Sequence, residues 1–157
     1  QKEMWNYLPK INKQIKIPPS MMMSDWMGSD FTNDDLAKES SYIEDFDVVD
    51  FKKNNQYVIT LKPKAQTVSL WERIIISIDM KTMLPLEQTF FNEKGEKIRA
   101  LIFSEPHKFG SKVIPRKLTM FSFVNKGHST SIYYVDLDFN PQINENFFSF
   151  KNLKKGL

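Results

Sequence analysis

The chain of 157 residues contains no cysteine, which excludes disulfides, thiolate catalysis and cysteine-based metal sites. It has only five glycines, and they form no glycine-rich loop that could cradle a phosphate. No apolar run approaches the roughly 18 residues that a membrane-spanning helix needs. The two histidines, His107 and His128, have no ligand-type residue at metal-binding spacing. The sequence therefore predicts no catalytic residue, no metal site and no cofactor.

The charge of the chain is nearly balanced. Twenty-two Lys and Arg face nineteen Asp and Glu, which leaves a net charge of +3. Nucleic-acid-binding proteins gather basic residues into a stripe with aromatic platforms. The densest basic cluster here is Lys151, Lys154 and Lys155, which is typical of a solvated chain end. We therefore expect no nucleic-acid partner.

Alternating apolar and polar residues run through most of the chain and predict strands. Because the connections are too short for crossover helices, the strands should pair antiparallel. One helix is expected at residues 32–40, where Thr32 can cap the amides of Asp34 and Asp35. The expected strands are residues 3–8, 11–17, 42–51, 56–62, 69–79, 84–92, 97–105, 115–125 and 129–139, with an irregular stretch at 106–114 and a closing strand or extended tail at 147–150.

These elements predict a mainly β fold in a single domain, residues 1–157. The expected architecture is a curved antiparallel sheet that forms an open half-barrel with a short helical lid. The chain begins without Met, inside an expected strand. We therefore expect it to be a mature product or a fragment.

Several strands carry apolar residues on both faces. In residues 69–79, Ile74 and Ile76 share one face, while Trp71 and Ile75 occupy the other. A sheet with one solvated face alternates more regularly. The few residues expected in helices could not cover a whole face. The pattern therefore favours a sheet with one face that lines an apolar cavity.

Residues 21–27 hold four Met and one Trp, a soft surface that adapts to varied apolar partners. Two interpretations stay open: these side chains fill the core, or they gate a ligand. The sequence does not determine which face of the sheet is concave. The candidate ligand-binding residues of the cavity and lid are Met22, Met23, Trp26, Met27, Phe31, Leu36, Trp71, Ile75, Phe121 and Phe123.

Three segments resemble a known family. Residues 5–9 (WNYLP), residues 27–36 (MGSDFTNDDL) and residues 135–153 resemble motifs of the bacterial outer-membrane lipoprotein-sorting proteins, the LolA/LolB-like superfamily. The resemblance covers nearly the whole chain. It implies an unclosed β-barrel whose concave apolar face is covered by helices, and a periplasmic carrier of acyl chains without cofactor or chemistry. It also implies an N-terminal helix and first strands that this sequence does not contain.

We therefore expect a periplasmic carrier, not an enzyme, that binds an acyl chain or a lipoprotein in an apolar cavity. Burial of ten methylenes would contribute about 8 kcal/mol before costs, which is ample for reversible transfer. The expected partners are the acyl chain of a lipid or lipoprotein and an inner-membrane transporter. The alternative is a non-catalytic interaction module or an accessory subunit of an envelope transporter.

Overall fold

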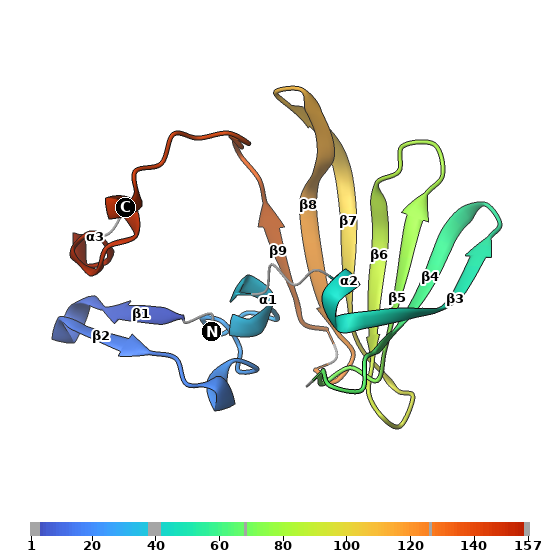
Figure 1. Cartoon of the computed structure of the whole chain (residues 1–157), viewed down its shortest axis with the longest axis horizontal. Helices are drawn as coiled ribbons and strands as arrows, with labels where there is room; N and C mark the ends of the chain where they lie inside the picture. The colour runs from blue at the N-terminus through green and yellow to red at the C-terminus, as the bar shows by residue number, and fades with distance from the viewer. Residues whose placement is uncertain (1–3, 38–41, 68, 126, 156–157) are drawn as a thin grey trace.

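The computed structural model describes residues 4–37, 42–67, 69–125 and 127–155 (Figure 1). Its centre is a seven-stranded antiparallel sheet in which each strand pairs with the next along the chain. Its two edge strands, β3 and β9, do not pair with each other, so the sheet stays open. The strands are β3 (Phe46–Lys53), β4 (Gln56–Pro63), β5 (Arg73–Asp79), β6 (Pro85–Phe91), β7 (Lys97–Phe109), β8 (Lys112–Ser122) and β9 (Ser129–Tyr133).

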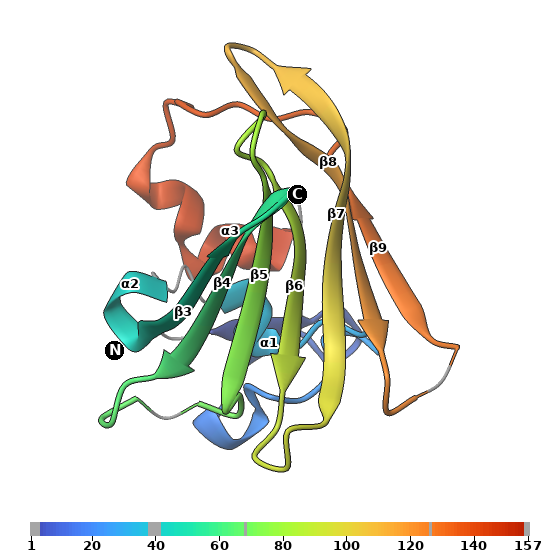
Figure 2. The same ribbon diagram turned by 90° about the vertical axis from the view of Figure 1, so that its right-hand side faces the viewer.

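The remaining elements lie on one side of this sheet, and its other face is bare (Figures 1 and 2). This arrangement confirms the expected open antiparallel sheet with short helices on one face. None of the helices in the described ranges is long and apolar enough to span a membrane. The elements are the hairpin β1 (Trp5–Leu8) and β2 (Lys13–Lys16), the 3-10 helices η1 (Pro9–Ile11), η2 (Pro19–Met21) and η3 (Glu145–Phe148), and the α-helices α1 (Asn33–Ala37), α2 (Tyr42–Asp45) and α3 (Phe150–Lys155).

The core sits on the covered face, here called the inner face. Ile74 of β5 lies between Leu61 of β4 and Phe90 of β6 in the sheet register. Because alternate residues of a strand share a face, Ile76 joins them. These side chains and Phe46 are buried in one cluster. The burial of this cluster holds the first four strands of the large sheet together.

The bare outer face also carries apolar side chains, but long basic side chains cover several of them. The guanidinium carbon of Arg73 lies 4.3 Å from the ring centre of Phe91. The Nζ atom of Lys117 lies 5.1 Å from the ring centre of Tyr133. Such stems shield an aromatic surface while the charge stays in water. The apolar residues on the outer face therefore do not require a second layer of protein to cover them.

Several expectations about local structure were wrong. The strand expected at residues 129–139 ends at Tyr133. Residues 42–45 form α2, whereas a strand was expected from residue 42. Residues 106–114, expected to be irregular, form the end of the long β7–β8 hairpin. Pro106 lies opposite Pro115, so the two residues without an amide donor pair with each other and interrupt the hydrogen bonds between the strands at one position only.

The expected closing strand at residues 147–150 is absent, because Phe147 and Phe148 end η3, Ser149 is its C-cap and Phe150 begins α3. There the side chain of Asn144 accepts a hydrogen bond from the amide of Asn146 and caps η3.

The core assignment predicts a large effect of truncation at Ile74, which is 1% exposed. Ile74→Ala should lower the free energy of unfolding by about 2–5 kcal/mol, because it removes apolar contacts and leaves a void. Ile43→Ala is the matched control, since Ile43 is 85% exposed and should change stability by less than about 0.5 kcal/mol. Urea unfolding measures both, and equal losses would contradict this core.

Candidate functional site

The start of α1 is fixed by a reciprocal cap. The Oγ1 atom of Thr32 accepts a hydrogen bond from the amide of Asp35 at 3.2 Å. The Asp35 carboxylate in turn accepts from the amide and hydroxyl of Thr32, at 2.8 and 2.9 Å. Thr32 therefore caps Asp35 as expected, but the Asp34 amide donates instead to the carbonyl of Met22 at 2.7 Å. Residues 38–40 of the expected helix lie outside the described residues.

Asp35 also forms an ion pair that anchors α1 to the inner face. Nη1 and Nη2 of Arg99 each lie 2.6 Å from an oxygen of the Asp35 carboxylate. Arg99 is only 6% exposed, and its guanidinium carbon lies over the adjacent rings of Trp71 and Phe90, 4.6 Å from each ring centre. A buried charge is tolerated only when it is paired. The pair therefore fixes α1 above β7.

A second attachment joins the segment before α1 to the edge strand β9. The amide of Asp30 donates to Oγ1 of Thr130 at 3.0 Å, and the Thr130 hydroxyl donates to the Asp30 carboxylate at 2.7 Å. Gly28 supplies the left-handed backbone that this turn requires, with φ of 75°. Phe31 between the two attachments is 4% exposed. We call residues 21–37 the lid and residues 28–35 within it the lid clasp, because the clasp ties the lid to both β7 and β9.

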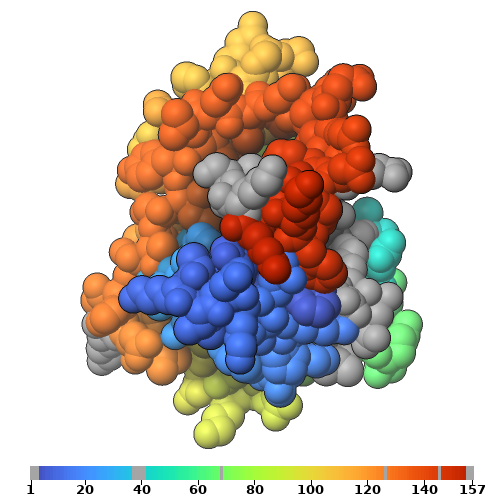
Figure 3. All heavy atoms as spheres, turned by 90° about the vertical axis from the view of Figure 1, so that its left-hand side faces the viewer, coloured from blue at the N-terminus to red at the C-terminus, as the bar shows by residue number. Residues whose placement is uncertain are grey.

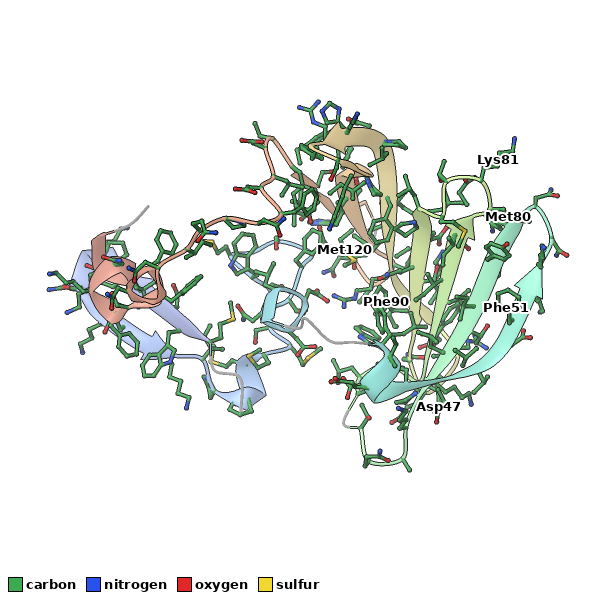
Figure 4. The ribbon with its side chains drawn as sticks, turned by 45° about the horizontal axis from the view of Figure 1, so that its top comes forward. Asp47, Phe51, Met80, Lys81, Phe90 and Met120 are labelled. Carbon is green, nitrogen blue, oxygen red and sulfur yellow. The ribbon has the colours of Figure 1, made fainter. Side chains whose placement is uncertain are left out.

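Between the clasp, α2 and the inner face lies a half-open apolar pocket of about 230 Å³. Phe90 and Met120 lie on the inner side of the sheet, toward the lid (Figure 4). Its polar lining comes from Asp34, Asp35, Tyr42, Gln88, Arg99 and Tyr134. The apolar lining comes from Phe31, Leu36, Phe46, Trp71, Ile74, Phe90, Leu101, Leu118, Met120 and Ile132.

A polar pocket of about 280 Å³ adjoins the apolar one. The two pockets share Trp71, Arg99 and Met120 in their walls. The site therefore offers an apolar compartment and a hydrogen-bonding compartment on either side of one buried ion pair. The polar groups of the second pocket come from Asp25, Asp30, Thr32, Ser122, Asn125 and His128.

Tyr42 of α2 closes another side of the apolar pocket. Its hydroxyl donates to Oε1 of Gln88 on β6 at 3.1 Å. Burial raises the pKa of the Tyr42 phenol above its usual value of 10, and the negative charge of Asp35 raises it further.

Among the residues that the structure describes, no group of three His, Asp or Glu side chains could hold a metal ion.

Four of the ten residues predicted from the sequence line these two pockets. Phe31 and Leu36 line the apolar pocket, Met23 lines the polar pocket, and Trp71 lines both. The amide of Trp71 donates a hydrogen bond to Oγ of Ser69 at 3.0 Å, and this contact forms a turn before β5 begins. Because of this turn, the side chain of Trp71 reaches the inner face. The strand alternation assumed for residues 69–72 is therefore absent.

The other six residues lie elsewhere. Ile75 and Phe121 are on the outer face, opposite to the pocket. Met22 and Trp26 are half-buried in the lid, whereas Met27 is 84% exposed. Phe123 lines, with Phe121, a separate pocket of about 370 Å³ at the end of β8.

Sequence reasoning missed several residues of the site. Arg99 gave a partial signal, because it shares one strand face with the apolar Leu101 and Phe103, and a charge on an apolar face needs a partner where that face is buried. Leu118 and Met120 share one strand face in the sequence, but nothing there identifies that face as the inner one. Leu101 and Ile132 carry no signal beyond ordinary alternation.

The buried ion pair predicts an asymmetric double-mutant cycle. Asp35→Asn should lower the free energy of unfolding by about 3–5 kcal/mol, because it leaves the buried Arg99 uncompensated. The double variant Asp35→Asn with Arg99→Met should lose far less, since it removes both charges together. Urea unfolding of the single and double variants measures the cycle. A loss below 1 kcal/mol for Asp35→Asn would refute the anchoring role.

The raised pKa of Tyr42 predicts that the contribution of its side chain to the free energy of unfolding falls at alkaline pH. Its folded pKa is raised, so its contribution to stability is complete below about pH 10 and is lost as the pH rises through the folded pKa. Compared with wild type, Tyr42→Phe should be about 1 kcal/mol less stable near neutrality, through loss of the bond to Gln88. That difference should shrink above about pH 10. Urea midpoints of both proteins across this range test it, and a constant difference would contradict it.

Comparison with known proteins gives the family. A protein-family model described as "Uncharacterized protein" matches residues 1–155. No curated protein matches the sequence. A DUF1329 family protein from Desulfovibrio piger has a similar structure, with a TM-score of 0.83 and 20% identity, over 96% of this chain and 64% of its own.

Two further solved structures are similar. An outer membrane lipoprotein-sorting protein domain from Vibrio parahaemolyticus has a TM-score of 0.79 and 25% identity, over 97% of this chain and 66% of its own. A LolA superfamily protein from Nitrosomonas europaea has a TM-score of 0.71 and 13% identity, over 96% and 68%. This chain thus spans about two thirds of each neighbour's length. The chain therefore belongs to the family that the matched family model describes, and the solved structures show that its fold is LolA-like.

Proposed function

We propose that this protein is a non-catalytic periplasmic carrier that holds an acyl chain of a lipid or lipoprotein against the inner face of its sheet. The observation that carries the proposal is the apolar pocket beneath the lid clasp. The LolA-like fold supports it, because one structural neighbour is named as an outer membrane lipoprotein-sorting domain.

The size of the pocket sets how much of a guest it can hold. Its volume of about 230 Å³ is below the roughly 300–1,000 Å³ typical of pockets for drug-sized ligands. It would therefore take one segment of an acyl chain. Each buried methylene contributes about 0.8 kcal/mol, so five or six of them give about 4–5 kcal/mol. An interaction of this size suits a carrier that must also release its cargo.

The inner face offers a path for the rest of such a chain. Beyond the pocket, Ile59 and Ile78 are half-buried on the inner face. Phe51 continues the surface at the edge strand β3 and is 55% exposed (Figure 4). A longer acyl chain that extends from the pocket toward β3 would cover these residues and remove apolar surface from water.

The polar pocket suits the polar end of the same guest. Ser122, Asn125 and His128 can donate or accept hydrogen bonds there. The Nε–H of Arg99, at the boundary of the two pockets, is buried and has no hydrogen-bond partner in the described part of the chain. An ester or amide carbonyl of the guest would satisfy this donor, and buried donors are nearly always satisfied.

A second candidate function is an interaction module or accessory subunit of an envelope transporter. The observation that favours it is Met27, which is 84% exposed and has a φ of 52°. A large apolar side chain in a strained, exposed position is typical of a contact site. Photo-crosslinking from position 27 in cells discriminates the two functions, because protein adducts favour the module and lipid adducts favour the carrier.

The carrier function predicts selective loss of acyl binding on the inner face. Leu118→Trp should weaken binding of a dansyl-labelled undecanoic acid at least about tenfold, because the larger side chain fills the pocket. Phe121→Trp is the matched control on the same strand, and its outward side chain should leave binding within about twofold. Dansyl fluorescence titration measures both, and urea unfolding checks that the variants fold.

The binding experiment shows which face of the sheet holds the acyl chain, and whether the protein binds an acyl chain at all. Native mass spectrometry of protein purified without detergent should also detect an acyl species that Leu118→Trp lacks. If Phe121→Trp weakens binding and Leu118→Trp does not, the guest occupies the outer face and the proposed pocket is wrong. If wild type binds no acyl probe, the carrier function itself is wrong.

A further inference from the structure

The net positive charge of the protein comes from the two ends of the sequence. Residues 1–24 and 140–157 together carry seven Lys and two acidic residues. The 115 residues between them carry fifteen Lys and Arg against seventeen Asp and Glu. The central sheet and the clasp are therefore slightly acidic, and the whole net charge of +3 arises from the termini.

These two ends lie side by side. The side-chain amide of Gln14 on β2 donates to the carbonyl of Phe150 on α3 at 2.8 Å. The ring of Phe150 packs edge-on against Trp5 of β1, with 4.9 Å between ring centres. Figure 3 shows the N-terminal and C-terminal segments next to each other on the side of the molecule away from the bare face. We call residues 4–16 together with residues 145–155 the terminal patch.

The terminal patch exposes apolar as well as basic side chains. Phe148 is 77% exposed and Ile11 is 57% exposed. Monomers in water rarely expose so many large apolar groups together. The exposed apolar residues of the patch are Trp5, Ile11, Ile15, Phe147, Phe148, Phe150 and Leu153. Its exposed basic residues include Lys10, Lys13, Lys151 and Lys154.

The composition of the patch distinguishes a membrane from a protein as its partner. Protein–protein interfaces are enriched in Arg and depleted in Lys, whereas all basic residues of the patch are Lys. Lys interspersed with Trp, Phe and Ile is the composition of segments that lie on an anionic lipid surface. There the ammonium groups stay near the lipid phosphates while the aromatic rings enter the boundary region.

We propose that the terminal patch docks this protein on an anionic membrane surface. Lysines near such a surface each strengthen partitioning by about fivefold. The aromatic and aliphatic side chains add hydrophobic contact that does not depend on salt. The proposal does not depend on the acyl-binding pocket, because the patch lies on other elements and would dock an empty protein equally well.

Vesicle co-sedimentation of the full chain tests the proposal. Wild type should bind vesicles of phosphatidylglycerol and phosphatidylcholine, bind phosphatidylcholine alone far more weakly, and lose much of its binding at high salt. The triple variant Lys10→Gln, Lys13→Gln, Lys154→Gln should bind the anionic vesicles about a hundredfold more weakly. Phe148→Ala should weaken binding that persists at high salt.

A charge-matched control separates a docking surface from net charge. The triple variant Lys81→Gln, Lys94→Gln, Lys108→Gln removes the same charge from exposed positions on the large sheet and its turns. It should retain binding within about threefold of wild type. Equal weakening by both triple variants would overturn the proposal, and so would the absence of wild-type binding to anionic vesicles.

The same experiment identifies a different occupant of the patch. Sedimentation velocity without vesicles reports whether the chain self-associates. A dimer that Phe148→Ala dissociates, with no vesicle binding by wild type, would assign the patch to a second copy and overturn membrane docking. Circular dichroism of each variant confirms that lost binding does not reflect lost folding.

Discussion

The lid depends on one buried ion pair, between Asp35 and Arg99. Helices α1, α2 and α3 have five, four and six residues, far too few to be stable on their own in water. Their position must therefore come from tertiary contacts. The Asp35 carboxylate supplies two such contacts at once, because it completes the cap of α1 and neutralises a charge that the inner face buries. The same carboxylate therefore positions α1 and neutralises the buried charge of Arg99.

The two faces of the sheet have different roles. The inner face keeps its apolar side chains for the core cluster and the pocket. The outer face carries aromatic rings that basic stems cover, so it can meet water without a second layer. This division leaves an apolar surface between the clasp and the sheet that is both sheltered and accessible. A carrier needs such a surface, since its guest must enter and leave.

The sequence predicted the architecture well, because alternation and short connections determine an antiparallel meander. It also predicted the cap at Thr32, which is a local signal. It failed where tertiary contacts override local pattern, as at residues 42–45, where α2 packs Tyr42 against Phe46. The inner face could not be identified from the sequence either. Trp71 changes face through the turn at Ser69, and Arg99 is explained only by a partner sixty-four residues away.

We propose that the surface between the clasp and the inner face receives an acyl chain. Intermolecular nuclear Overhauser effects between a bound acyl chain and the protein methyl groups report where such a chain lies. We expect contacts from the acyl chain to the methyls of Leu118, Met120 and Ile132, which line the pocket. Contacts to Ile75 of the outer face in their place, or no contact to any methyl group, would contradict this proposal.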